Sequence, residues 1–119
     1  MIYILDDDEA MADSMFWLVT AMGFSAKVCL NPAQFIKEYQ PEPSDKLIVD
    51  IRMPEISPYE FRVELKKHNI QIPLIYVSAL IDDGRSDLVK TLSNNDFNQV
   101  LGFLSKPFEP EHLQNLLAA

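Results

Sequence analysis

The chain has 119 residues, which is enough for one domain with a single hydrophobic core and too few for two. Hydrophobic residues make up 48% of the sequence, but no run is long enough to cross a bilayer, so we expect a soluble domain without a membrane segment. The 18 acidic residues outnumber the 10 basic ones, and the basic residues form no cluster, which argues against direct nucleic-acid binding. The single cysteine and the absence of a signal-peptide pattern favour a cytoplasmic location.

Strand and helix patterns alternate along the first half of the chain. The apolar run Ile2–Leu5 predicts a buried strand, and Glu9–Met22 predicts a helix that Gly23 ends. Ala26–Leu30 predicts a second strand. Asn31–Gln34 combines an N-cap, a first-turn proline and a glutamine at the capping-box position, so a second helix begins there. The apolar face of the first helix, interpreted as core, consists of Met11, Met15, Leu18 and Met22.

The second half continues this alternation. Leu47–Asp50 and Leu74–Ser78 predict two further buried strands, and Ser57–Glu60 between them repeats the cap, proline and box pattern of a helix start. Three elements complete the chain: a helix at Ser86–Leu92, a strand at Val100–Leu104 and a short helix at Glu109–Leu117.

Alternating strands and helices with near-continuous apolar strands indicate an α/β fold, in which helices cover both faces of a parallel sheet. Ligands of such sheets bind beyond the carboxyl ends of the strands. Four of the predicted strands have polar residues at or just after their carboxyl ends. These residues are Asp6, Asp7, Asp50, Ser78 and Lys106. We therefore expect these residues to meet at one rim of the sheet.

The residue types at this rim indicate phosphoryl-transfer chemistry. Converging carboxylates raise one another's pKa unless a cation lies among them. Carboxylate and carbonyl oxygens without nearby His or Cys ligands favour Mg²⁺, with Mn²⁺ as the alternative, and Mg²⁺ keeps waters that a phosphate oxygen can replace. Lys106 supplies a positive charge and Ser78 a hydroxyl donor for a phosphoryl group. Asp8 and Glu9 are interpreted instead as favouring the N-terminus of the first helix.

Four motifs, "ILDDDEA", "LIVDIRMP", "LIYVSAL" and "FLSKPF", follow one another along nearly the whole chain. Together they resemble the receiver domain of two-component response regulators, so residues 1–119 are expected to form one receiver domain. The resemblance implies a doubly wound, flavodoxin-like sheet of five parallel strands in the order 2-1-3-4-5. It also implies a signalling domain that assists its own phosphorylation and dephosphorylation, and not an independent enzyme.

The resemblance also implies roles for individual residues. Asp50 matches the phosphoacceptor, which takes a phosphoryl group from a sensor histidine kinase or a phosphotransfer protein. Ser78 and Lys106 match residues that contact the phosphoryl group, and Phe103 matches the aromatic residue that changes rotamer in the family's switch. The implied metal ligands are Asp6, Asp7, Asp50 and the backbone carbonyl of Arg52.

The resemblance further implies a downstream output, with transcription as the expected one, and a homodimer through the face between the fourth and fifth helices. The short final helix indicates a fragment of a longer regulator. Two features depart from the family pattern. Pro58 stands where a glycine is usual, and the interval from Ser78 to Lys106 is about six residues longer than usual, which leaves the conformation of residues 79–102 open.

Two alternatives belong to other functional classes. A degenerate receiver would act as a phosphorylation-independent protein-binding module, and the unusual interval before Lys106 is the feature that favours it. A haloacid-dehalogenase-like phosphatase would use Asp6 as nucleophile and Asp8 as the second acid of its motif. Ala10 stands where that phosphatase motif expects Thr or Val, which weighs against the second alternative.

Overall fold

The sheet of the computed structural model, which describes residues 1–53, 55–78, 97–106 and 109–118, contains five parallel strands in the order β2-β1-β3-β4-β5. The strands are β1 (Ile2–Leu5), β2 (Ala26–Cys29), β3 (Lys46–Asp50), β4 (Leu74–Ser78) and β5 (Val100–Ser105). The described helices are α1 (Glu9–Ala21), α2 (Pro32–Glu38), α3 (Pro58–Lys67) and α5 (Pro110–Ala118). The predicted strand order is confirmed, whereas the helix predicted at Ser86–Leu92 lies outside the described residues.

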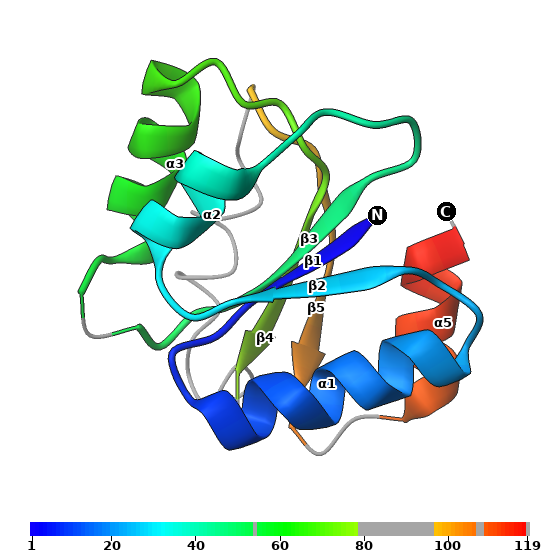
Figure 1. The fold of residues 1–119 in the computed structure, drawn as a ribbon. Coiled ribbons are helices and arrows are strands. Elements are labelled where there is room, and N and C mark those ends of the chain that lie inside the picture. Colours follow the sequence, from blue (N-terminus) through cyan, green and yellow to red (C-terminus); the bar gives the residue numbers. More distant parts are fainter. Residues whose placement is uncertain (54, 79–96, 107–108, 119) are drawn as a thin grey trace.

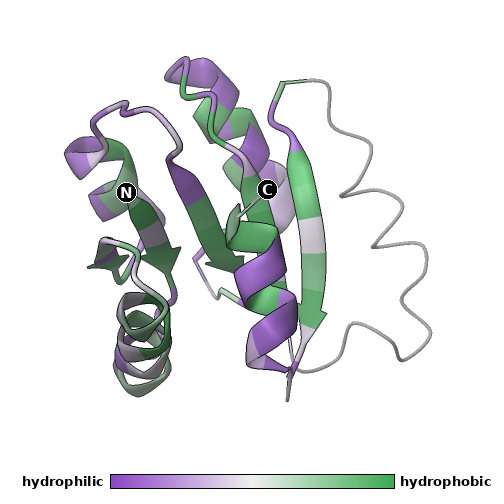
Figure 2. Ribbon diagram, turned by 90° about the vertical axis from the view of Figure 1, so that its right-hand side faces the viewer, coloured by the Kyte–Doolittle hydropathy of each residue, from purple (hydrophilic) through white to green (hydrophobic). Residues whose placement is uncertain are grey.

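Helices cover both faces of the sheet, with α2 and α3 on one face and α1 and α5 on the other (Figure 1). Successive strand residues point to opposite faces, so Tyr3 and Leu5 pack with α2 and α3, whereas Ile2 and Ile4 pack with α1 and α5. Figure 2 shows largely hydrophobic strands between helices of mixed hydropathy, as expected for helices that bury one side. Each face therefore has its own hydrophobic core.

The predicted helix boundaries have the expected caps. Asp8 Oδ1 accepts the N–H of Met11 at 3.2 Å, which confirms its role at the N-terminus of α1. At α3, Ser57 and Glu60 form the complete capping box, and Pro58 occupies the first turn as predicted. Gly23, which follows α1, has a φ of +95° that favours glycine.

The capping box expected at α2 is only half formed. Asn31 accepts the N–H of Gln34 at 2.7 Å, but the Gln34 side chain accepts the N–H of Leu30 instead of that of Asn31. The φ of Asn31 is −154°, whereas that of Ser57 is −74°. The angle φ sets the direction of the N–H group of the cap residue itself. Glu60 therefore accepts the N–H of its cap residue Ser57, whereas Gln34 accepts the N–H of Leu30, the residue before its cap.

Helix α5 rests on β5 through a close approach at Gly102. A Cβ atom at this position would lie 2.9 Å from Leu116 Cδ2, so a side chain here would force the leucine to move. The absence of a side chain at Gly102 thus allows α5 to approach β5, the edge strand of the sheet.

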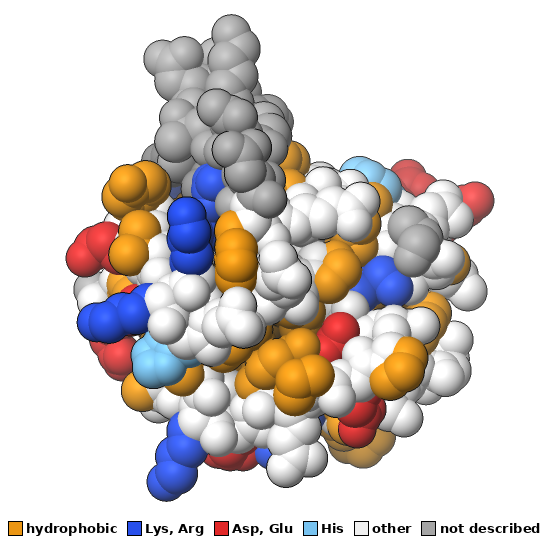
Figure 3. Space-filling model, turned by 90° about the horizontal axis from the view of Figure 1, so that it is seen from above, with side chains coloured by type: hydrophobic (Ala, Val, Ile, Leu, Met, Phe, Trp, Pro, Cys, Tyr) orange, Lys and Arg blue, Asp and Glu red, His pale blue; other side chains and the backbone are white. Residues whose placement is uncertain are grey.

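Two surface observations bear on partners. Among the described residues, no helix combines the length and apolar character that crossing a membrane requires. Figure 3 shows the face seen from above, where basic, acidic and hydrophobic side chains are interspersed.

The core on the α2–α3 face predicts a clear contrast between two positions of α3. Leu65 is fully buried, and Leu65→Ala should lower the free energy of unfolding by about 2–5 kcal/mol because it leaves a cavity. Val63 on the same helix is 49% exposed, and Val63→Ala should change that free energy by no more than about 0.5 kcal/mol. Urea unfolding measures both, and equal losses would contradict this account of the core.

Candidate functional site

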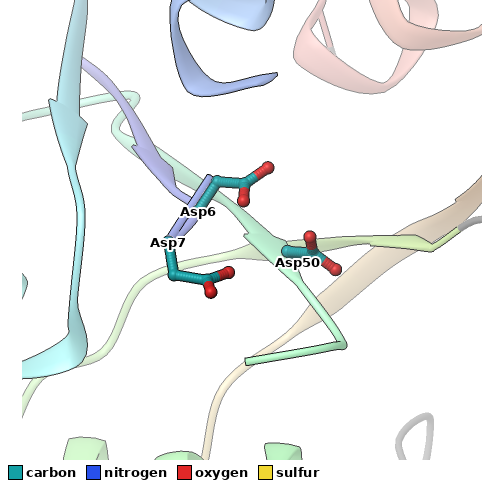
Figure 4. A group of neighbouring side chains, drawn as sticks. All are labelled: Asp6, Asp7 and Asp50. Atoms are coloured by element: carbon teal, nitrogen blue, oxygen red, sulfur yellow. The ribbon is translucent and has the colours of Figure 1, made fainter. Parts of the chain in front are cut away.

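Three aspartates meet at the carboxyl ends of β1 and β3. Leu5 of β1 pairs with Val49 of β3, so the next residues, Asp6 and Asp50, lie side by side. One carboxylate oxygen from each of Asp6, Asp7 and Asp50 can be chosen so that all three lie within 4.8 Å of one another. Their carboxylates extend to the same side of the strand ends (Figure 4). The structure thus brings together the three acidic residues that the sequence singled out.

Local turns orient two of these carboxylates. Asp6 Oδ1 accepts the N–H of Asp8 at 2.9 Å, and Asp50 Oδ1 accepts the N–H of Arg52 at 2.9 Å. Each bond spans two residues and forms the Asx turn that aspartate favours after a strand. Arg52 is exposed and lies directly beyond β3, so its backbone is near the cluster while its side chain faces solvent.

The environment of Asp6 disfavours its charged form. Burial raises the pKa of Asp6 to about 6, and the nearby carboxylates of Asp50 and Asp7 also raise it. The hydrogen bond from Asp8 N–H and the positive charge of Lys106 oppose this shift. A cation among the carboxylates would remove the conflict, and their oxygens are the ligands that Mg²⁺ prefers.

Ser78 and Lys106 lie at the ends of the adjacent strands β4 and β5. Ser78 is 1% exposed and pairs with Ser105, and the N–H of Lys106 donates to the Ser78 carbonyl at 2.9 Å. Lys106 also lines a cavity together with Asp6 and Asp50. Asp6, Asp50 and Lys106 therefore meet near the carboxyl ends of β1, β3 and β5, and Ser78 ends the adjacent strand β4.

Phe103 lies on β5, directly paired with Tyr76 of β4. The two rings stack with centroids 5.5 Å apart and planes 18° apart. Tyr76 is fully buried, and its burial raises its pKa to about 12 against the opposing effect of the Arg62 guanidinium on α3. The sequence analysis identified Phe103 but not its stacking partner Tyr76. The only feature of the sequence that could have pointed to Tyr76 is a ring with a hydroxyl group inside an otherwise apolar strand.

The interpretation of the whole apolar stripe of α1 as core was wrong for Met11. Met11 is 38% exposed, whereas Met15, Leu18 and Met22 pack against the core of the α1–α5 face. Met11 lies in the first turn of α1, near the rim, where it lines the cavity beside Asp6 and Asp50. Its helical spacing is the same as that of its neighbours, so periodicity alone could not separate it from them.

Comparison with known proteins shows the family. Residues 2–118 match the model of the response regulator receiver domain. The chain belongs to this family. Response regulator TodT of Pseudomonas putida is 32% identical over 119 residues, which are 100% of this chain and 50% of TodT. Transcriptional regulatory protein FixJ of Bradyrhizobium diazoefficiens is 31% identical over 117 residues, which are 98% of this chain and 54% of FixJ. The receiver chain thus spans about half the length of these curated relatives.

Solved structures show the same fold. The crystal structure of FixJ-N superimposes with a TM-score of 0.78 at 24% identity, covering 98% of this chain and 89% of that chain. Chemotaxis protein CheY4 of Vibrio cholerae gives a TM-score of 0.73 at 19% identity, covering 98% of this chain and 94% of that chain. Receiver domains are signalling domains that bind Mg²⁺ at an acidic pocket and interact with histidine kinases or phosphotransfer proteins, and this receiver domain has such an acidic cluster.

The raised pKa of Asp6 predicts a pH-dependent stability in metal-free buffer. Folding raises this pKa from 3.8 to about 6, so the folded state holds more protons than the unfolded state between these values. Stability should therefore fall as pH rises from about 3 to about 7, by about 3 kcal/mol from this residue, of which about 2 kcal/mol is lost between pH 4 and pH 6. Asp6→Asn removes this titration. In metal-free buffer, the stability of the variant relative to the wild type should therefore be higher at pH 7 than at pH 4.

Urea unfolding in EDTA between pH 4 and pH 8 measures this difference. Asp13→Asn is the matched control, since it removes an exposed carboxylate of α1 outside the cluster. Added Mg²⁺ should stabilise the wild type at pH 7 more than it stabilises Asp6→Asn. Parallel pH profiles for wild type and Asp6→Asn would contradict the assigned burial of this carboxylate.

Proposed function

We propose that residues 1–119 act as one receiver domain that accepts a phosphoryl group on Asp50, in a Mg²⁺-dependent reaction, from a histidine kinase or a phosphotransfer protein. The observation that carries this proposal is the meeting of Asp6, Asp7 and Asp50 within 4.8 Å, with Lys106 lining the same cavity. Fixed carboxylates, a metal site and a nearby ammonium group are the elements that phosphoryl transfer requires.

The metal ligands in this proposal are Asp6, Asp7, Asp50 and the backbone carbonyl of Arg52. Asp7 is exposed and is assigned as a direct ligand, whereas the buried Asp6 is assigned to bind largely through water. Carboxylate and carbonyl oxygens suit Mg²⁺, with Mn²⁺ as the alternative. When bound, the metal neutralises charge on the carboxylates and on the transferring phosphoryl oxygens.

Asp50 is the nucleophile in this mechanism. One of its carboxylate oxygens attacks phosphorus in line with the P–N bond of a phosphohistidine, and an acyl phosphate forms as that bond breaks. The bonding electron pair returns to the imidazole of the donor protein. Lys106 and the Ser78 hydroxyl stabilise the phosphoryl oxygens. Water later hydrolyses the acyl phosphate, so the domain assists its own phosphorylation and dephosphorylation without turning over an independent substrate.

The proposed switch involves Phe103. The stacking of Phe103 on the buried Tyr76 supports an inward bias of this ring before phosphorylation. Phe103 has no hydroxyl group that would hold it at the surface by a hydrogen bond. Phosphorylation would then act mainly through Ser78 and Lys106 and would shift an equilibrium that already favours the inward ring.

The proposed biological setting is a cytoplasmic transcriptional regulator. FixJ is by name a transcriptional regulatory protein, and this chain corresponds to about half of it. We place the output in the other half of such a regulator, and we assign homodimerisation to the face that includes β5 and α5. The dehalogenase-like alternative is disfavoured, because the Asp8 carboxylate caps α1.

A phosphorylation assay tests the proposed acceptor. Incubation with Mg²⁺ and acetyl phosphate should add one phosphoryl group to the wild type, as measured by intact mass, and none to Asp50→Asn. Glu9→Gln is the matched control, since it removes an exposed carboxylate from the first turn of α1 and should keep the adduct. An adduct that persists in Asp50→Asn would reject this acceptor. Absence of any adduct on the wild type would favour the phosphorylation-independent binding module.

A second measurement tests the inward bias of Phe103. Beryllium fluoride, which mimics a phosphoryl group, should shift the NMR amide signals of Ser78 and Lys106 while the Phe103 ring signals move little. Tyr76→Leu removes the stacking partner and should enlarge the movement of the Phe103 signals, because the inward position loses a ring contact worth about 1 kcal/mol.

Tyr59→Leu is the matched control for this experiment, since Tyr59 is 65% exposed on α3. It should leave the Phe103 response as small as in the wild type. Phe103 signals in the wild type that move as far as those of Ser78 would show that the ring changes position on activation, contrary to the proposal.

A further inference from the structure

A cavity of about 500 Å³ lies between α1 and the sheet, next to the acidic cluster. Its apolar walls come from α1 on one side and from β1, β3 and β4 on the other. The apolar lining residues are Met11, Met15, Leu18, Ile4, Leu5, Ile48 and Val77. Binding sites for small organic molecules typically have this size and this predominance of apolar residues. A metal ion and a phosphoryl group need only the polar rim, so phosphoryl transfer does not explain the apolar part.

One end of the cavity is charged. Asp6 and Asp50 line it together with Lys106, so in the metal-free protein the carboxylates outnumber the ammonium group. Asp6 is only 8% exposed, and the apolar walls beside it weaken solvent screening. A positive group at this end would therefore gain two nearby negative partners, whereas a negative group would meet one positive partner and two negative ones.

We propose that this cavity binds a small amphipathic cation, with its apolar body against Met11 and Met15 of α1 and its ammonium group beside Asp6 and Asp50. The head group of the ligand occupies the place assigned to Mg²⁺. The ligand and the metal ion therefore compete, and bound ligand suppresses the Mg²⁺-dependent phosphorylation of Asp50. The competition with Mg²⁺ and the suppression of phosphorylation rest on the proposed function, whereas binding of the ligand does not.

Hexylammonium is a suitable probe, with hexanoate and hexanol as matched controls for its charge. In EDTA-treated protein, hexylammonium should shift the NMR methyl signals of Met11 and Met15 in a saturable way, with at least tenfold higher affinity than hexanoate or hexanol. Butylammonium should bind about tenfold more weakly than hexylammonium, because it buries two fewer methylene groups. No saturable shift with hexylammonium, or tighter binding of hexanoate or hexanol, would overturn the proposal.

Two variants of α1 locate the binding site. Met15→Phe adds bulk inside the cavity and should weaken hexylammonium binding at least tenfold, whereas Met22→Phe should not, because Met22 packs against the same core outside the cavity. Ser14 also lines the cavity from an exposed position, so Ser14→Leu provides a second obstruction if Met15→Phe does not fold. Equal affinity in the obstructing variant and in Met22→Phe would overturn the assigned site.

Competition with Mg²⁺ completes the test. Rising Mg²⁺ should lower the apparent affinity for hexylammonium, and hexylammonium should slow acetyl phosphate labelling at limiting Mg²⁺ but not at saturating Mg²⁺. Affinity that does not depend on Mg²⁺ would overturn the placement of the head group. Labelling of Asp50 without ligand tests the proposed function separately, so failure of that labelling and failure of ligand binding are distinguishable outcomes.

Discussion

The meeting of three carboxylates, one of them buried, at the ends of two neighbouring strands is the constraint on which the site depends. The pairing of β1 with β3 places Asp6 beside Asp50, and the residues that follow each strand turn back to donate one N–H to each carboxylate. The hydrogen bond from Asp8 N–H only partly offsets the cost of charging Asp6, since burial and, to a smaller extent, the carboxylates of Asp50 and Asp7 raise its pKa to about 6. The hydrophobic cores on both faces stabilise the strands and so offset the unfavourable free energy of these carboxylates. A bound cation would lower that free energy, which favours cation binding at this site.

The described side chains differ between the two faces of the sheet. On the α2–α3 face, the rings of Tyr3, Phe35 and Tyr39 contact one another, and Phe61 of α3 extends this aromatic cluster. The α1–α5 face contains the cavity of about 500 Å³ beside the acidic residues. The α1–α5 face therefore has room for a small ligand beside the acidic residues.

Much of the fold and of the rim could be predicted from the sequence because the signals are local. Apolar runs identify strands, and a cap, a proline and a glutamate three residues after the cap identify the start of α3. Strand ends then place Asp6, Asp50 and Lys106 at one rim. The stacking of Tyr76 on Phe103 and the exposure of Met11 depend on strand register and on how α1 sits over the sheet, which residue spacing alone does not encode.

The alternation of side chains along β4 connects the site to both faces at once. Tyr76 and Ser78 are two residues apart and point to the same face, whereas Val77 points to the other face and lines the cavity. Movement of Ser78 toward a phosphoryl group would act on the side of β4 where Tyr76 stacks on Phe103, and the backbone bond from Lys106 to Ser78 ties β5 to the same movement. A ligand beside Val77 would press on the opposite side of the same strand. In the proposed mechanism, a shift of the carboxyl end of β4 would therefore reach both the switch residues on one face and the cavity on the other.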